Sequence, residues 1–204
     1  MVSPNRKTQK TAQAARPERI STMDVCQTPP YALDPLIRPL RALRIVIDGM
    51  IPKVWDPAAG QGLLARAWRD REFLTVETDL LGGVNFLDPF SLVDHYDAIV
   101  TNPPYSLKYD FLEQCLTLGR PFALLVPVET LGAARAQKTI ESAGCQVIFM
   151  DHRVNFKMPN KGWAGAAWFP VCWICGWLNL PDQMNFAHID PWTAEQVIAW
   201  ESKK

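Results

Sequence analysis

The chain has 204 residues and a mass of 23.0 kDa, a size that favours one domain. Hydrophobic residues make up 48% and charged residues 21%, which excludes a disordered chain. No apolar run reaches the roughly 18 residues of a membrane span, and the polar, basic N-terminus lacks a secretory pattern. We therefore expect an intracellular, cytoplasmic protein without membrane contact.

The first twenty residues differ in charge from the rest of the chain. Five lysines and arginines stand against Glu18 alone, a local charge of +4, although the formal net charge of the chain is zero. This predicts a basic, flexible arm over residues 1–20 and a single domain over residues 21–204. The arm either contacts phosphate groups or is a solvated tail without a partner.

Strands and helical patterns alternate along the chain. Apolar runs predict strands over residues 54–56, 73–76, 96–101, 122–126 and 146–150, with antiparallel edge strands within 168–177. Helices are expected over residues 32–50, 63–71, 109–118 and 132–143. This order is typical of an α/β fold with a mostly parallel, doubly wound sheet.

A glycine-containing turn, Asp56–Gly62, follows the first strand. Ligands of open α/β sheets bind at the carboxyl ends of strands. Gly60 and Gly62 carry no Cβ, so the backbone can approach a ligand closely, and Asp56 can accept a hydrogen bond from an ammonium group. A single G-x-G pair argues against a pyrophosphate ligand. A plain strand-to-helix connection is the alternative.

The second strand ends in two acidic residues, Glu77 and Asp79. A carboxylate at this place can accept both hydroxyls of a ribose. Asp79 is the first candidate and Glu77 the second, and a surface acid without a ligand is the alternative. Together with the glycine turn, these acids suit a ligand with an ammonium and a ribose but no phosphate. S-adenosylmethionine fits this description.

The most specific motif is Asn102-Pro103-Pro104-Tyr105, which follows an apolar strand. Two prolines fix the backbone and withhold two N–H donors. The Asn102 side-chain oxygen and the Pro103 carbonyl can each accept from one exocyclic amine, and Tyr105 can stack on a planar ring. The alternative is a rigid turn in which Tyr105 only packs.

These motifs resemble those of the class I, Rossmann-like S-adenosylmethionine-dependent methyltransferases that methylate amino groups. The resemblance covers roughly residues 24–156 and is strongest to small phage-borne DNA adenine-N6 methyltransferases. It implies cofactor contacts for eight residues, namely Thr28, Pro29, Asp56, Ala58, Gly60, Asp79, Asn85 and Phe86. Asn85 departs from the aspartate usual in the family, and Ala58 stands where many class I enzymes have glycine.

The resemblance also implies a catalytic role for Asn102–Tyr105 and transfer of a methyl group to N6 of adenine in DNA. Tyr105, Phe156 and Lys157 would contact the substrate, although core packing explains Phe156 better. The alternatives are an RNA adenine-N6 methyltransferase, a protein glutamine-N5 methyltransferase, and a non-catalytic module with the same fold. DNA is favoured over RNA, and the little chain left after the sheet predicts short or relaxed sequence specificity.

Cysteine and histidine give no further site. An odd number of cysteines, five, in a chain of this size makes a disulfide framework unexpected. Cys172 and Cys175 have the spacing of metal ligands, but no second pair exists and they lie in an apolar run, which favours a buried strand. His95, His152 and His188 show no ligand spacing. The sequence therefore predicts no metal site.

Overall fold

The computed structural model of the chain describes residues 22–45, 51–90, 93–159, 162–163 and 169–203. The predicted basic arm over residues 1–20 lies outside these residues, as do residues 46–50 of the first predicted helix. No helix in the described ranges is long and apolar enough to cross a membrane.

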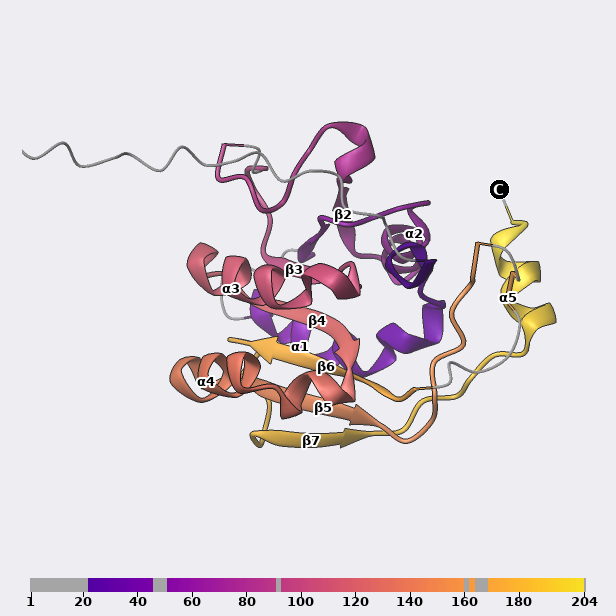
Figure 1. Cartoon of the computed structure of the whole chain (residues 1–204). Coiled ribbons are helices and arrows are strands. Elements are labelled where there is room, and N and C mark those ends of the chain that lie inside the picture. Colours follow the sequence, from indigo (N-terminus) through magenta and orange to yellow (C-terminus); the bar gives the residue numbers. More distant parts are fainter. Residues whose placement is uncertain (1–21, 46–50, 91–92, 160–161, 164–168, 204) are drawn as a thin grey trace, which may run out of the picture.

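One mixed sheet of seven strands organises the chain, in the order β2-β1-β3-β4-β6-β5-β7 (Figure 1). Its strands are β1 Lys53–Asp56, β2 Leu74–Glu77, β3 Ala98–Thr101, β4 Phe122–Pro127, β5 Gln146–Met150, β6 Val171–Gly176 and β7 Met184–Ala187. β1 to β4 are parallel, and β6 runs antiparallel to both β4 and β5, which flank it. The predicted α/β class with a mostly parallel sheet is confirmed. The antiparallel strand β6 falls in the predicted segment 168–177, but it lies between β4 and β5 rather than at an edge of the sheet.

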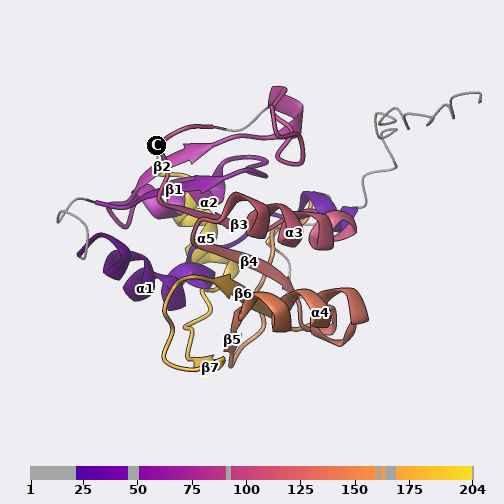
Figure 2. The ribbon, with the colours of Figure 1, turned by 90° about the vertical axis from the view of Figure 1, so that its left-hand side faces the viewer.

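Helices cover both faces of this sheet. They are α1 Asp34–Ile45, α2 Leu63–Arg69, α3 Lys108–Leu118, α4 Ala134–Ala143 and α5 Ala194–Glu201. Figure 2 shows α1 on one face and α3 and α4 on the other. The sequence did not predict α5, or β7, which pairs in parallel with β5. Both are short, and β7 has a half-exposed pattern.

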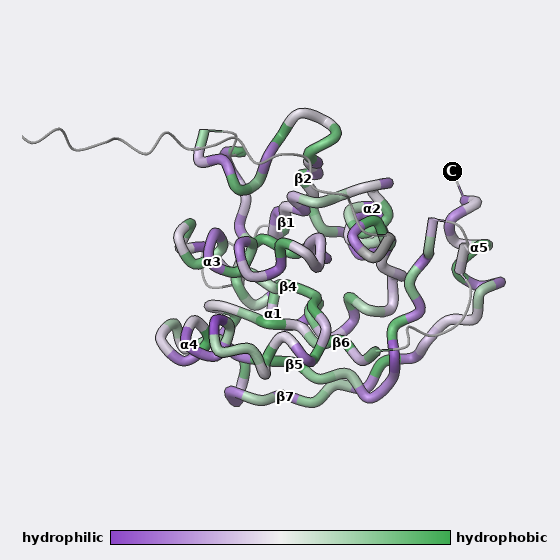
Figure 3. Tube along the Cα trace, viewed as in Figure 1, coloured by the Kyte–Doolittle hydropathy of each residue, from purple (hydrophilic) through white to green (hydrophobic). Residues whose placement is uncertain are grey.

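Two hydrophobic cores form because the central strands alternate their side chains between the two faces. On β4, Ala123 and Leu125 join the core under α1, α2 and α5, whereas Leu124 and Val126 join the core under α3. All six residues of β4 are buried. The hydrophobic colouring of this strand in Figure 3 agrees with burial on both faces, as expected for a central strand of a sheet that helices cover on both sides.

The sheet brings the predicted site residues to one edge. β1 lies between β2 and β3, and Asp56 at its end is in register with Glu77 at the end of β2. Beyond the strands, Thr78 N donates to Asp56 O (2.9 Å) and Ala59 N to Thr78 O (3.0 Å). The glycine turn, the acidic strand end and the start of the Asn102 motif therefore follow three adjacent strands.

The N-terminal segment before α1 is attached to the far part of the chain. Gln27 and Lys157 pair as an antiparallel bridge, with Gln27 N donating to Lys157 O at 3.0 Å. The buried Tyr31 hydroxyl accepts from Asn155 N (2.8 Å), and Trp173 Nε1 donates to Ala32 O (2.9 Å). These bonds fix residues 27–32 beside the carboxyl edge of the sheet.

Candidate functional site

The turn after β1 requires glycine at two positions. Gly60 has φ +54° and Gly62 has φ +73°, in the left-handed region that other residues rarely adopt. A Cβ on Gly60 would lie 2.5 Å from Gln27 Nε2, and one on Gly62 would lie 2.7 Å from Glu77 Oε2. The backbone conformation therefore favours glycine here, whereas the side-chain ends that a Cβ would meet can move aside.

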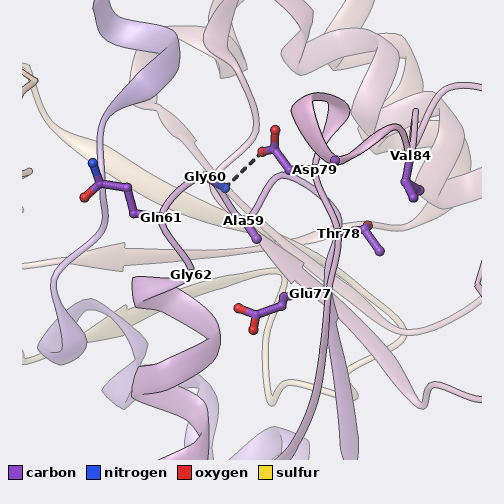
Figure 4. Close-up of a pocket in the computed structure, with 9 residues that line it drawn as sticks. Ala59, Gly60, Gln61, Gly62, Glu77, Thr78, Asp79 and Val84 are labelled. Carbon is purple, nitrogen blue, oxygen red and sulfur yellow. Dashed lines mark hydrogen bonds between the residues drawn. The ribbon is translucent and has the colours of Figure 1, made fainter. Parts of the chain in front are cut away.

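An open pocket of about 400 Å³ lies over this turn, a volume in the range of small-molecule sites. Its lining comes from the glycine turn and from the segment after β2, and consists of Ala59, Gly60, Gln61, Gly62, Glu77, Thr78, Asp79, Gly82 and Val84 (Figure 4). The pocket thus joins the two motifs that the sequence assigned to one ligand.

The two acids of this pocket make different contacts. Asp79 accepts from Gly60 N through Oδ2 and from Leu81 N through Oδ1, each at 2.9 Å, so it ties the two loops together. The half-exposed Glu77 carboxylate turns toward Gly62 and meets Arg69 at 3.4 Å on the surface. An ion pair this exposed is weak. Glu77 therefore keeps more capacity to accept from a ligand.

Asp56 lies buried beneath the turn. It is 2% exposed; Oδ1 accepts from Ala58 N at 3.3 Å, and Oδ2 has no hydrogen-bond partner. Burial raises the pKa of this carboxyl to about 7, although the Thr101 side chain and the Ala58 N–H act to lower it, and the negative charges of Glu77 and Asp79 add to the rise. A buried carboxylate with an unpartnered oxygen is stabilised by a hydrogen-bonding or cationic ligand group.

The Asn102 side chain lies just after β3, and only its amide nitrogen has a hydrogen-bond partner. Its Nδ2 donates to Cys26 O at 3.4 Å, whereas its Oδ1 is buried without a hydrogen-bond partner. Pro103 and Pro104 follow and offer no N–H. The two prolines therefore offer carbonyl acceptors and no backbone donor, which suits a ligand rich in donors.

Tyr105 is buried beside this motif. It is 8% exposed and packs edge-on against Phe169, with ring centroids 5.8 Å apart. Its hydroxyl has no hydrogen-bond partner, and burial, then the neighbouring Cys26 and Cys172, raise its pKa well above the usual value. Asp24 accepts from Ser106 N (3.1 Å) and Ser106 Oγ (3.0 Å) just after it. The stacking of Tyr105 on a substrate ring stays a prediction.

Four of the other predicted cofactor residues, Thr28, Pro29, Asn85 and Phe86, do not line the pocket. Thr28 and Pro29 are buried in the attached N-terminal segment. Asn85 is exposed, and its Oδ1 accepts from Leu87 N at 3.1 Å. Phe86 is buried between Trp55 and other aromatic rings, 5.3 Å from the Trp55 centroid. Asn85 and Phe86 are absent from the pocket lining.

The two late substrate-side residues also face inward. Phe156 is buried in a hydrophobic core. Lys157 Nζ pairs with Glu201 in α5 and donates to Gln61 Oε1 at 3.3 Å. Lys157 therefore reaches the glycine turn and an acid, which leaves its contact with a substrate a prediction.

Sequence reasoning missed a glutamine pair over the turn. Gln61 N donates to Gln27 Oε1 at 3.2 Å, and the Gln27 amide lies against Gly60. The position of Gln27 directly before Thr28 was the available signal. Its contact with Gln61 could not be predicted from the sequence, because the two residues are 34 positions apart.

Comparisons with known proteins address the fold. No protein-family model and no curated protein sequence matches the chain. Among solved structures, a Listeria monocytogenes protein provisionally assigned as a class I S-adenosylmethionine-dependent methyltransferase matches with a TM-score of 0.50 and 14% identity, over 86% of this chain and 69% of its own. The chain thus has the class I, Rossmann-like methyltransferase fold.

Weaker matches are the type IIG restriction endonuclease BpuSI and an Agrobacterium tumefaciens protein described as a predicted O-methyltransferase. BpuSI matches with a TM-score of 0.43 and 13% identity, over 72% of this chain and 24% of BpuSI. The Agrobacterium protein matches with a TM-score of 0.35 and 14% identity, over 75% of this chain and 85% of its own.

Proposed function

We propose that this chain is an S-adenosylmethionine-dependent methyltransferase that methylates the exocyclic N6 amine of adenine in DNA. The observation that carries the proposal is the buried, unpartnered Oδ1 of Asn102 just after β3, the strand that pairs with β1, whose glycine turn lines the pocket. Most buried polar atoms of native proteins have a hydrogen-bond partner. A ligand with N–H donors would supply the missing partner.

The residues present fit the cofactor. The unpartnered Asp56 Oδ2 would accept from its ammonium group. Glu77 would hold the ribose hydroxyls rather than Asp79, because both Asp79 oxygens already accept from backbone N–H groups. Gly60 and Gly62 leave space for the ligand along the turn. Bound S-adenosylmethionine supplies an electrophilic methyl group on a sulfonium.

Asn102 and Pro103 orient the amine. Asn102 Oδ1 accepts one N–H and the Pro103 carbonyl accepts the other, which turns the nitrogen lone pair toward the methyl group. The cofactor would supply the methyl group, while Asn102 and Pro103 would hold the amine in place and nearby acceptors would take up the proton that the methylated nitrogen loses. This orientation provides the catalysis. No cysteine nucleophile takes part.

DNA is the proposed substrate because of the motif resemblance and the basic residues 1–20. An adenine inside a duplex cannot reach a pocket at the sheet edge, so a duplex substrate requires base flipping. Tyr105 would stack on the flipped base. Since Tyr105 is only 8% exposed, stacking requires that its surroundings open.

The test incubates the purified chain with labelled S-adenosylmethionine and, separately, unmethylated duplex DNA, RNA and protein extract. The products are digested and identified by mass. We expect N6-methyladenine from DNA. Label in RNA or in glutamine would support a methyltransferase activity but refute DNA as its substrate. No label together with no cofactor binding would refute the activity and favour a non-catalytic module.

Asn102→Ala provides the matched variant. We expect it to abolish transfer and to leave cofactor affinity nearly unchanged, since Asn102 does not line the cofactor pocket. Equilibrium binding of the cofactor and initial rates measure the two effects. Equal loss of binding and transfer would contradict the role of Asn102 in holding the amine.

A further inference from the structure

Two histidines and two aspartates meet at the carboxyl edge of the last parallel strand pair, away from the pocket. Asp151 directly follows β5 and His188 directly follows β7, and these strands pair in parallel up to Met150 and Ala187. Asp151 N donates to Ala187 O at 3.1 Å, which continues the pairing. The sheet therefore places Asp151 beside His188, although they are 37 positions apart in the sequence.

The imidazoles converge on the Asp151 carboxylate. His152 Nδ1 lies 2.9 Å from Asp151 Oδ1, and His188 Nδ1 lies 2.6 Å from Asp151 Oδ2. One potential ligand atom from each of the three residues lies within 4.8 Å of the others. The ligand atoms of a tetrahedral zinc site are about 3.3 Å apart, given Zn–N and Zn–O bonds near 2.0–2.1 Å. Small side-chain rotations would bring the three atoms around one ion.

The supporting contacts resemble those around bound metals. His188 uses its other nitrogen, Nε2, to meet Asp190 Oδ1 at 3.1 Å. A metal-ligating histidine usually donates its second N–H to a carboxylate, which fixes the ring and its tautomer. Asp151 Oδ1 also accepts from Ile189 N at 3.0 Å, which holds the carboxylate. These contacts therefore fix the orientation of the His188 ring just after β7 and of the Asp151 carboxylate just after β5.

We propose that Asp151, His152 and His188 bind a divalent transition-metal ion, Zn²⁺ in the first place, with Asp190 orienting His188. Imidazole and carboxylate ligands suit zinc. The two carboxylates supply negative charge for a dication, and the exposed position leaves water to complete the coordination. The ion would join the ends of β5 and β7.

This site is independent of the proposed methyl transfer. The ion would anchor the start of the segment that leads from Asp151 to Lys157, which pairs with Gln27 beside the glycine turn. Its effect is therefore structural. The sequence predicted no metal site because its three histidines lack ligand spacing, and only the pairing of β5 with β7 brings two of them together.

The test titrates Zn²⁺ into the chelator-treated chain, purified without a histidine tag, in competition with a chromophoric chelator. We expect one equivalent to bind. His152→Asn and His188→Asn should each lower the affinity at least tenfold, and Asp190→Asn by about tenfold or more. His95→Asn is the matched control, because His95 is exposed outside the cluster, and should bind as the unaltered chain does.

Two results would overturn the proposal. The first is no saturable binding of Zn²⁺ by the unaltered chain. The second is equal affinity of His152→Asn, His188→Asn and His95→Asn. Circular dichroism of each variant confirms that the fold is retained. Because binding is measured without cofactor or nucleic acid, failure here leaves the proposed transferase activity unaffected, and the reverse also holds.

Discussion

Gly62→Ala separates the role of the glycine turn in folding from its role in binding the cofactor. Gly62 has φ +73°, and a Cβ there would lie 2.7 Å from Glu77 Oε2. The left-handed conformation costs a residue with a Cβ about 1–2 kcal/mol. The end of a glutamate side chain moves at little cost. The substitution should therefore lower stability modestly and displace the Glu77 carboxylate.

Gly119→Ala is the matched control. Gly119 follows α3 with φ +62°, and a Cβ there would meet nothing within 4 Å. Both variants should lose about 1–2 kcal/mol of unfolding free energy, which lowers Tm by about 2–8 °C in a chain of this size. Only Gly62→Ala should also weaken cofactor binding. A hydrogen bond to a charged group contributes about 1.5–3 kcal/mol, so its Kd should rise roughly ten- to a hundredfold.

Thermal unfolding and equilibrium titration with S-adenosylmethionine measure the two quantities. Equal cofactor affinity in the Gly62 and Gly119 variants would refute the idea that the Glu77 carboxylate beside Gly62 holds the ligand. A much larger loss of stability in Gly62→Ala would show that the added methyl group strains the backbone rather than moves one side chain.

Three further predictions concern charge. Cofactor affinity should increase as the pH rises through about 7, by up to tenfold per unit below that value, because ionised Asp56 accepts the ammonium; Asp56→Asn should remove this dependence in titrations between pH 5.5 and 7.5. Glu77→Gln should weaken cofactor binding about tenfold and leave Tm nearly unchanged, since Glu77 is half-exposed; unchanged affinity would move the ribose contact to Asp79. Removal of residues 1–20 should lower DNA affinity and flatten its salt dependence in filter-binding assays; if neither changes, the arm is a passive tail.

Features set by short stretches of sequence could be predicted, and features set by distant pairing could not. The turn Asp56–Gly62 could be predicted because aspartate and glycine follow a short apolar strand. Five of the predicted strands correspond to β1 to β5 of the structure. β7 was missed because it is an edge strand with alternate residues exposed. The different contacts of Glu77 and Asp79 depend on Gly60 N and Leu81 N, which only the folded turn brings to Asp79.

The sheet register aligns the proposed donor and acceptor. Trp55 of β1 pairs in register with both Val76 of β2 and Ile99 of β3, so the residues that follow each strand emerge at neighbouring positions. Trp55 and Ile99 are fully buried in one core, which makes this register rigid. Asp56 and Asn102 therefore lie at the ends of a rigid framework rather than on independent loops. Strand ends would then determine the chemistry, while loops and the N-terminal residues would determine which amine reaches it.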